Sequence, residues 1–281
     1  MLKIIMEIRF QNSPKETSQM ITKELRSNFL VEQLVEADKV NYVYSHYERM
    51  IIGGAKPVNK TLTLDNHPEL RAEYFLERRE LGIINTGGDG TVVADGITYS
   101  LSRLSCVYLG KGTKEVSFQS HDKKNPAVFF LLSAPAHQTY PNKKMTKEEA
   151  SPVALGEVAT ANQRTIYKYI HLDGIQSCQL VMGLTVLNTG SVWNTMPSHT
   201  HTRRSEVYFY FDVPEQHRVF HFMGEPTETR HLVVANQEAI ISPPWGIHSG
   251  SGTSNYSFIW AMAGENLVFT DMDAVPIGGL K

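Results

Sequence analysis

The chain is poor in cysteine, and this scarcity excludes two kinds of site. It has 2 cysteines in 281 residues, Cys106 and Cys178, which lie far apart and show no CxxC spacing. We therefore expect neither a disulfide framework nor a zinc site built from thiolates, and we predict that both thiols are reduced. Long apolar runs are also missing. The run at residues 127–134 is among the longest, and it is far shorter than the roughly 20 residues that span a bilayer.

Neither sign of charge is in clear excess. Lysine and arginine total 27 against 29 aspartates and glutamates, so the sequence lacks the basic field that attracts nucleic acid or anionic lipid. We therefore expect no nucleic-acid partner and no membrane partner. The N-terminal stretch MLKIIMEIRF has no small-residue cleavage site after its short apolar patch, which predicts a cytoplasmic protein. With 41% hydrophobic residues, the chain can bury one large core or two smaller ones.

Apolar spacing predicts one helix near the N-terminus and strands after it. Between residues 15 and 35, apolar side chains recur at the spacing of one helix face, which predicts an amphipathic helix. Beyond it, short apolar runs alternate with glycine and proline, a pattern typical of β-strands. Asp95 and Gly96 separate two such runs and predict a tight primed turn in a hairpin. Many short strands about ten residues apart favour a mainly β sandwich or barrel.

The two halves of the chain resemble each other weakly. Residues 75–90 and 201–212 both carry an arginine pair and a glutamate before an alternating strand, and residues 125–136 and 255–266 both place a long apolar strand after an asparagine. This pattern predicts two diverged copies of one β module. Residues 141–165 have the poorest apolar patterning, so we place the boundary there, with one half at 1–150 and the other at 151–281.

Four residues of the second half predict a metal site. His199 and His201 are two residues apart, so on a strand both imidazoles share a face. Glu206 lies an odd number of residues from His201, so a turn or bulge around residues 203–205 must bring it to the same face. A proline and glycine turn then leads into His248. Two histidines at this spacing alone are more often ordinary strand residues, but three imidazoles with a carboxylate suit zinc, iron, manganese or nickel.

Residues near these ligands are candidates for catalysis and substrate binding. Tyr208 and Tyr210 share the face of Glu206, and either one could move a proton, although strand aromatics are usually core residues. Arg164 and Lys168 are four apart on a predicted strand, and Arg203 or Arg204 lies beside the ligands. Each of these cations could bind a carboxylate, and surface exposure is the alternative for each.

The first half lacks the corresponding ligands. Its matching positions read Phe75, Leu76, Glu77 and Arg78, and Lys114 falls near the place of the last histidine. We therefore predict that only the second half holds a metal.

The ligand spacing resembles that of the cupin superfamily, whose motifs are HxH followed by glutamate, and a proline and glycine turn ending in histidine. The chain departs from this pattern in one respect, since only Ile247 separates Gly246 from His248 where two residues are usual. Longer stretches narrow the resemblance, among them VYSHYERMIIGG, YFLERRELGIINTGGDG, WNTMPSHTHTRRSEVYFYF and ISPPWGIHSG. From about residue 10 onward, these are similar to the 5-keto-4-deoxyuronate isomerase family.

This resemblance implies a bicupin, which is two double-stranded β-helix barrels, with one zinc ion per subunit bound by His199, His201, Glu206 and His248. It also implies a homohexamer that acts in pectin and uronate breakdown. The implied reaction converts 4-deoxy-L-threo-5-hexosulose uronate to 3-deoxy-D-glycero-2,5-hexodiulosonate: an aldehyde becomes a primary alcohol and the neighbouring hydroxyl becomes a ketone. From the site alone, a metal-dependent cupin dioxygenase or a non-catalytic sugar-binding bicupin would also fit.

Overall fold

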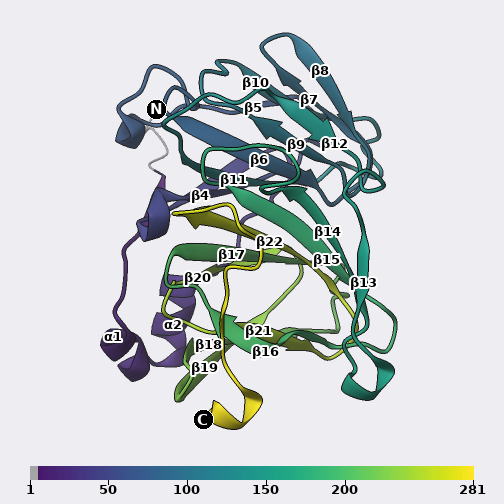
Figure 1. The fold of residues 1–281 in the computed structure, drawn as a ribbon. Coiled ribbons are helices and arrows are strands. Elements are labelled where there is room, and N and C mark those ends of the chain that lie inside the picture. Colours follow the sequence, from purple (N-terminus) through teal and green to yellow (C-terminus); the bar gives the residue numbers. More distant parts are fainter. Residues whose placement is uncertain (1–5) are drawn as a thin grey trace.

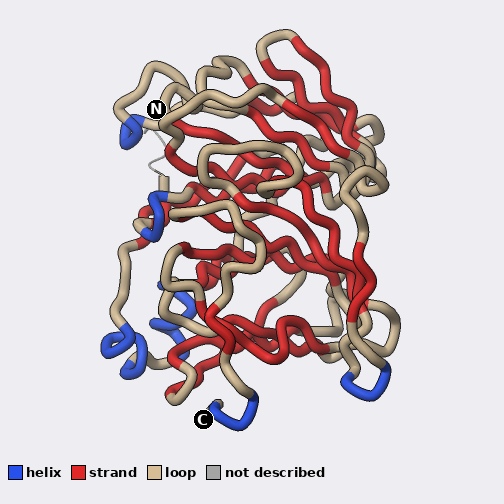
Figure 2. Tube along the Cα trace, in the orientation of Figure 1, coloured by secondary structure: helices blue, strands red, loops and turns tan. Residues whose placement is uncertain are grey.

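Strands make up most of the regular structure in the computed structural model, which describes residues 6–281 (Figures 1 and 2). They form four sheets, two from each half of the chain, and the few short helices lie at the periphery. Apart from the parallel pair β1 and β3, the strands of these sheets pair in antiparallel fashion. The predicted mainly β, two-barrel fold is therefore confirmed.

The N-terminal module consists of a seven-stranded and a four-stranded sheet. The larger sheet has the order β1 (Glu7–Arg9), β3 (Val40–Ser45), β4 (Ile51–Ala55), β11 (Phe129–Pro135), β6 (Arg79–Asn85), β9 (Cys106–Leu109) and β12 (Lys143–Met145). The smaller sheet has the order β5 (Leu62–Thr63), β10 (Val116–Ser120), β7 (Gly90–Ala94) and β8 (Ile97–Leu101). Short 3-10 helices at Tyr47–Arg49 and Pro68–Leu70 lie between strands.

The C-terminal module repeats this plan with a seven-stranded and a five-stranded sheet. The larger sheet has the order β13 (Val153–Leu155), β14 (Arg164–Ile170), β15 (Val181–Leu187), β22 (Ser257–Gly264), β17 (Arg204–Phe211), β20 (Glu238–Ser242) and β2 (Leu30–Val31). The smaller sheet has the order β19 (Glu228–Val234), β18 (Val219–Glu225), β21 (His248–Gly252), β16 (Trp193–Thr200) and β23 (Asp273–Ala274). Further 3-10 helices lie at Val158–Thr160 and Ile277–Gly279.

The internal repeat is visible in the strand order. The long apolar strand β11 lies between β4 and β6, and its counterpart β22 lies between β15 and β17. The strands β6 and β17, which begin at the second arginine of each pair, therefore occupy equivalent places. This confirms the repeat that the sequence predicts.

The two seven-stranded sheets face each other, so the molecule has four layers of sheet with the smaller sheets outside (Figure 1). Phe130 of β11 stacks on Phe209 of β17, with ring centroids 4.9 Å apart. Gly82 lies against Met182 so closely that an added Cβ would be 2.5 Å from the methionine sulfur. Apolar packing therefore joins the two modules along their broad faces.

The N-terminal helix differs from the prediction. Instead of one helix over residues 15–35, there are two short ones, α1 (Pro14–Gln19) and α2 (Thr22–Phe29). Ser13 caps α1, and the extended backbone at Met20 ends it. The apolar side chains that follow α2 belong to β2, which pairs with β20. Strand pairing thus replaces the last turns of the predicted helix, and the N-terminal segment packs on the C-terminal module.

Two smaller features bear on the predicted boundaries. The turn between β7 and β8 has positive φ at both Asp95 and Gly96, +47° and +80°, which is the primed geometry expected of a tight hairpin. Within the predicted linker, β12 pairs with β9 of the first module, whereas β13 pairs with β14 of the second. Sheet membership thus changes between residues 145 and 153.

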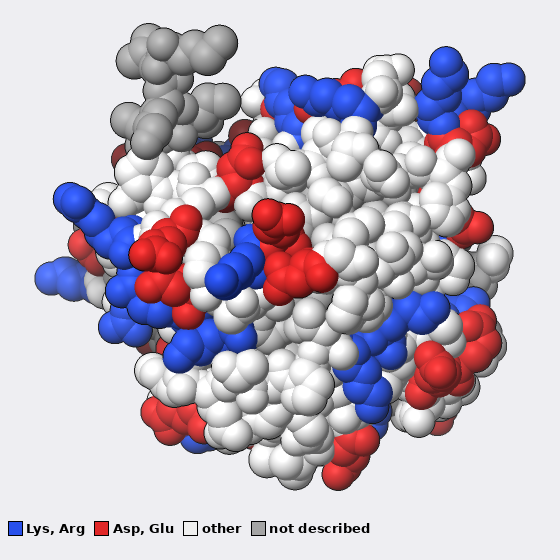
Figure 3. Space-filling model, turned by 90° about the horizontal axis from the view of Figure 1, so that it is seen from above, with Lys and Arg blue, Asp and Glu red and all other residues white. Residues whose placement is uncertain are grey.

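Charged side chains of both signs are interspersed on the face seen from above, around a broad uncharged centre (Figure 3). None of the helices in the part of the chain that the structure describes is long and apolar enough to cross a membrane. Half of the N-terminal stretch on which the cytoplasmic prediction depends, residues 1–5, lies outside the described residues.

Candidate active site

The four predicted ligands come together inside the C-terminal module. His199 belongs to β16, His201 follows that strand, Glu206 belongs to β17, and His248 begins β21. Their ligand atoms all lie within 4.8 Å of one another, and no other group of this kind is found among residues 6–281. β16 and β21 pair so that His199 and His248 stand directly opposite each other.

The separations within the cluster suit a metal ion. The Nε2 atom of His199 lies 3.1 Å from Nε2 of His201 and 2.9 Å from Nε2 of His248. An oxygen of the Glu206 carboxylate lies 3.3 Å and 3.1 Å from the Nε2 atoms of His201 and His248. Metal–ligand bonds of about 2.0–2.2 Å place neighbouring ligands about 3 Å apart. The four residues could therefore hold one metal ion.

Burial prepares the imidazoles for a metal. It lowers the pKa of His199 to about 3, with help from His201 and Arg204, and it lowers the pKa of His248 well below its ordinary value. Both rings are therefore neutral near pH 7, which is the form that binds a metal. His201 and Glu206 are buried as well, so little water competes for the ligand atoms.

The predicted turn between His201 and Glu206 is present, slightly earlier than expected. It covers residues 201–203, where the Arg204 N–H donates to the carbonyl of His201 at 3.3 Å, and β17 begins at Arg204. Within β17 the alternation then places Glu206, Tyr208 and Tyr210 toward the interior. The shorter connection before His248 is accommodated by a turn in which the Gly246 N–H donates to Pro243 at 3.1 Å.

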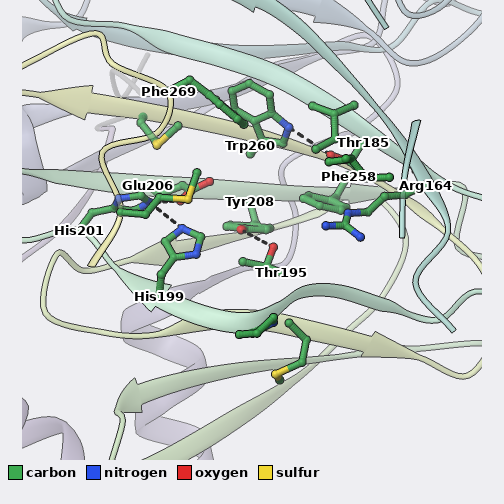
Figure 4. Close-up of a pocket in the computed structure, with 16 residues that line it drawn as sticks. Arg164, Thr185, Thr195, His199, His201, Glu206, Tyr208, Phe258, Trp260 and Phe269 are labelled. Atoms are coloured by element: carbon green, nitrogen blue, oxygen red, sulfur yellow. Dashed lines mark hydrogen bonds and ion pairs between the residues drawn. The ribbon is translucent and has the colours of Figure 1, made fainter. Parts of the chain in front are cut away.

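A cavity of about 260 Å³ opens beside the ligands (Figure 4). His199, His201 and Glu206 lie at one end, Arg164 lies at the other, and Tyr208 and Thr195 lie between them. The wall is largely apolar and is formed by Leu155, Ile166, Met196, Pro197, Phe258, Trp260, Met262, Phe269 and Met272. The cavity thus has candidate metal ligands at one end and a guanidinium at the other, separated by an apolar wall.

Tyr208 lines this cavity. Its hydroxyl shares a 3.2 Å hydrogen bond with Thr195, a residue that an irregularity in β16 holds at a φ of +50°. Burial and the nearby Glu206 carboxylate raise the pKa of Tyr208 well above its ordinary value. The phenol therefore stays protonated near neutral pH, and either hydroxyl of the Tyr208–Thr195 pair could be the donor.

Tyr210 shares the inward face but does not line the cavity. Its hydroxyl lies 2.8 Å from Nδ1 of the buried His221, which belongs to β18 of the smaller sheet. Burial raises its pKa well above the ordinary value as well. The structure therefore separates the two tyrosines, and only Tyr208 is within reach of a molecule in the cavity.

The three predicted substrate-binding cations lie in different surroundings. Arg164 is half-buried and lines the cavity. Lys168 holds its ammonium 5.3 Å from the centre of the Phe269 ring and does not line the cavity. Arg203 is engaged at the rim by Asp271 and Asp273, with hydrogen bonds of 2.8 and 3.0 Å. Only Arg164 therefore has a guanidinium available to a ligand in the cavity.

Sequence comparison places the chain among known proteins. A family model described as the KduI/IolB family matches residues 29–276. The chain belongs to the KduI/IolB family. It is 55% identical over 276 residues to the 4-deoxy-L-threo-5-hexosulose-uronate ketol-isomerase of Shouchella clausii. The aligned region covers 98% of this chain and 100% of that protein. The enzymes of the same name from Yersinia pestis and Caldicellulosiruptor bescii are 54% and 51% identical, again over 98% of this chain and 100% of theirs.

Solved structures share the fold at low sequence identity. An IolB-like protein of Salmonella typhimurium superposes with a TM-score of 0.68 at 16% identity, covering 88% of this chain and 97% of that one. The oxalate decarboxylase of Lactobacillus farciminis superposes with a TM-score of 0.60 at 9% identity, covering 89% and 88%. These neighbours support the two-cupin architecture for this family member.

The N-terminal module of this KduI/IolB family member has an apolar interior instead of a ligand set. Counting from the arginine that begins each strand, Leu81 of β6 stands where Glu206 stands in β17. Phe75 and Leu76 are buried in the apolar core of that module, together with Leu81. Lys114 is exposed, with its ammonium 5.9 Å from the centre of the Tyr74 ring.

Several residues of the site were not predictable from the sequence. Thr195, Trp260 and Phe269 line the cavity but belong to no recognisable motif. Asp271 is another such residue, since its carbonyl oxygen lies 2.7 Å from Nδ1 of His201 across 70 positions of sequence. Contacts of this kind depend on the path of the chain after β22, which local patterns do not encode.

Proposed function

We propose that the chain is a ketol isomerase that converts 4-deoxy-L-threo-5-hexosulose uronate to 3-deoxy-D-glycero-2,5-hexodiulosonate in the breakdown of pectin and related uronates. The observation that carries this proposal is the full-length identity of 51–55% with relatives that bear the name of this activity. The cavity is consistent with it, because the open-chain substrate has an aldehyde at one end and a carboxylate at the other.

We further propose that the metal is zinc, one per subunit, held by His199, His201, Glu206 and His248. Three neutral imidazoles and a carboxylate are a common donor set for zinc, although manganese, iron and nickel accept it too. When bound, such an ion would supply Lewis-acid stabilisation to oxygens that become negative during isomerisation. Metal analysis of the purified protein would identify the ion.

The residues around the cavity have complementary roles in this proposal. Arg164 would hold the substrate carboxylate through its planar fork and so direct the aldehyde end toward the ligands. Tyr208, as a protonated phenol, would donate a hydrogen bond or a proton to an oxygen of the reacting carbons. The apolar wall would exclude water and contact the methylene that replaces a hydroxyl in the deoxy sugar.

Proton NMR in deuterated water tests the reaction directly. We expect metal-loaded protein to consume the deoxyuronate and form the ketose without uptake of oxygen, which separates isomerisation from cupin dioxygenase chemistry. The matched variant is Glu206→Leu, which introduces the residue found at the equivalent place of the N-terminal module. It should fold but lose both metal and turnover. Stabilisation by the sugar without conversion would instead indicate a binding protein.

We also propose that the protein is a homo-oligomer, a hexamer by family resemblance, and that it acts in the cytoplasm. Support for a self-interface comes from the edge strand β13 and the residues after it, where Val153, Leu155 and Val158 are 40%, 44% and 77% exposed. The two free cysteines suit a reducing compartment. Light scattering coupled to size exclusion would give the subunit number.

A further inference from the structure

The chain after β22 forms a strap along one side of the site, defined here as residues 265–275. Phe269 and Met272 of this strap line the cavity. Its end forms β23, which pairs with β16 so that Ala274 lies opposite His199. The strap is therefore both a wall of the cavity and a neighbour of the ligand strand.

Arg204 binds the strap from inside the molecule. It is one of the largest fully buried side chains, only 1% exposed, and its guanidinium donates to three carbonyl oxygens of the strap. The distances are 2.8 Å to Val268, 3.3 Å to Phe269 and 2.8 Å to Asp271. Burying a guanidinium is costly unless its donors are satisfied, so these bonds fix the strap to the start of β17.

The carbonyl of Asp271 links this arrangement to a ligand. It accepts from Arg204 and also lies 2.7 Å from Nδ1 of His201. Because Nε2 of His201 faces the other ligands, the ring proton must be on Nδ1 and is donated to this carbonyl. That bond sets both the tautomer and the orientation of the imidazole. The Arg204 Nε, 3.4 Å from the same Nδ1, then makes only a contact.

The neighbouring arginine holds the strap from outside. Arg203 donates to the carboxylates of Asp271 and Asp273, and Asn266 donates to Asp271 at 2.6 Å. These bonds are at the rim, where solvent weakens them. The buried contacts of Arg204 therefore contribute most to the position of the Asp271 carbonyl.

The N-terminal module provides an internal comparison. Arg79 begins β6 as Arg204 begins β17, is also buried, and donates to Ser133 and to the carbonyl of Arg49. A buried arginine at this place is thus common to both modules. Only in the C-terminal module do its acceptors include the carbonyl that contacts a ligand.

We propose that Arg204 is a positioning residue that couples the C-terminal strap to the metal centre, by presenting the Asp271 carbonyl to His201 and setting Phe269 and Met272 as the cavity wall. This inference rests on the proposed metal centre. It predicts that loss of the guanidinium fork weakens metal binding without removing any ligand.

The test measures zinc affinity by competition with a chromophoric chelator, and the visible spectrum of the cobalt-substituted protein. Arg204→Met should weaken zinc binding about 10- to 100-fold and alter the cobalt bands. Arg79→Met makes the same change at the equivalent place, and should lower the melting temperature while leaving both metal readouts unchanged. Arg204→Lys keeps the charge but cannot reach three carbonyls, so it should also weaken zinc binding, and it serves if the methionine variant does not fold.

Wild-type zinc affinity and an unchanged cobalt spectrum in a folded Arg204 variant would overturn the inference. Equal weakening by Arg79→Met would also overturn it, because general loss of stability would then explain the effect. A wild-type chain that binds no metal at all would instead refute the proposed metal centre, so the two failures can be told apart.

Discussion

The hydroxyl of Tyr108 donates a 2.7 Å hydrogen bond to the carboxylate of Glu80, and both side chains are fully buried where the two modules meet. The same carboxylate accepts from three consecutive backbone N–H groups of the C-terminal module, those of Cys178, Gln179 and Leu180, at 2.7, 2.8 and 3.0 Å. A single side chain of one module thus satisfies a run of backbone donors in the other. Burial and the adjacent Glu80 raise the pKa of Tyr108 well above its ordinary value.

Replacing Glu80 should weaken the contact between the two modules and so lower the stability of the protein. We expect Glu80→Ala to lower the free energy of unfolding by about 3 kcal/mol or more, because four buried donors lose their shared acceptor. Urea denaturation followed by circular dichroism measures this change. The exposed Glu115→Gln is the control and should unfold like the wild type; equal stability of the Glu80 and Glu115 variants would contradict the role of this carboxylate.

The two tyrosines of β17 should behave differently when each loses its hydroxyl. Tyr208→Phe should reduce kcat about 100-fold, since its hydroxyl reaches the cavity. Tyr210→Phe should keep most activity and lose about 1 kcal/mol of stability, because it removes buried hydrogen bonds, chiefly the one with His221, and no group of the cavity lining. Steady-state kinetics and thermal unfolding of both variants separate the roles. Similar kcat values for the two variants would remove Tyr208 from the mechanism.

The cations of β14 provide a matched pair for substrate binding. Arg164→Met should raise KM about 10- to 100-fold, because a carboxylate held by a guanidinium contributes roughly 1.5–3 kcal/mol. Lys168→Met should leave KM nearly unchanged, since that ammonium lies over the Phe269 ring outside the cavity lining. Initial rates over a range of substrate concentrations decide the matter. An effect on KM from the lysine change alone would reverse the assignment.

Stability of the metal-free protein should depend on the protonation of His221. Burial lowers the pKa of this ring to about 3. In the unfolded chain this ring takes up a proton near pH 6.5. The contribution of the neutral His221 to the free energy of unfolding is therefore fully present above pH 6.5, and it is lost as the pH falls toward 3. Between these two pH values, one such group adds about 1.4 kcal/mol per pH unit to the slope of the free energy of unfolding against pH. Urea titrations of chelator-treated His221→Asn should show a slope smaller by about this amount, and parallel curves would refute the expectation.

The sequence predicts that the four candidate ligands come together because their placement follows mostly local rules. Strand alternation aligns His199 with His201, and a turn restores Glu206 to the same face, so three of the four follow from short-range geometry. The place of His248 beside the other three depends on the pairing of β16 with β21. The proline and glycine turn before His248 predicts a candidate ligand but does not predict this pairing.

Other features depend on long-range contacts and are not predictable in this way. The helix predicted over residues 15–35 ends at Phe29 because β20 offers a pairing partner to the residues that follow. Lys168 follows the alternation expected of β14, yet its ammonium lies over the ring of Phe269, a residue of a segment about 100 positions later. The carbonyl of Asp271 carries no sequence signal at all, since any residue type supplies one.

The packing of the two seven-stranded sheets against each other has a consequence for how substrate enters. Apolar contacts such as the Phe130–Phe209 stack and the close approach of Gly82 to Met182 hold the two broad faces together, so we expect that relative movement of the modules does not open the candidate site. Substrate would then enter and leave within the C-terminal module, whose cavity wall includes Phe269 and Met272 of the strap. The rate of product release would then report on that segment and not on relative motion of the two barrels.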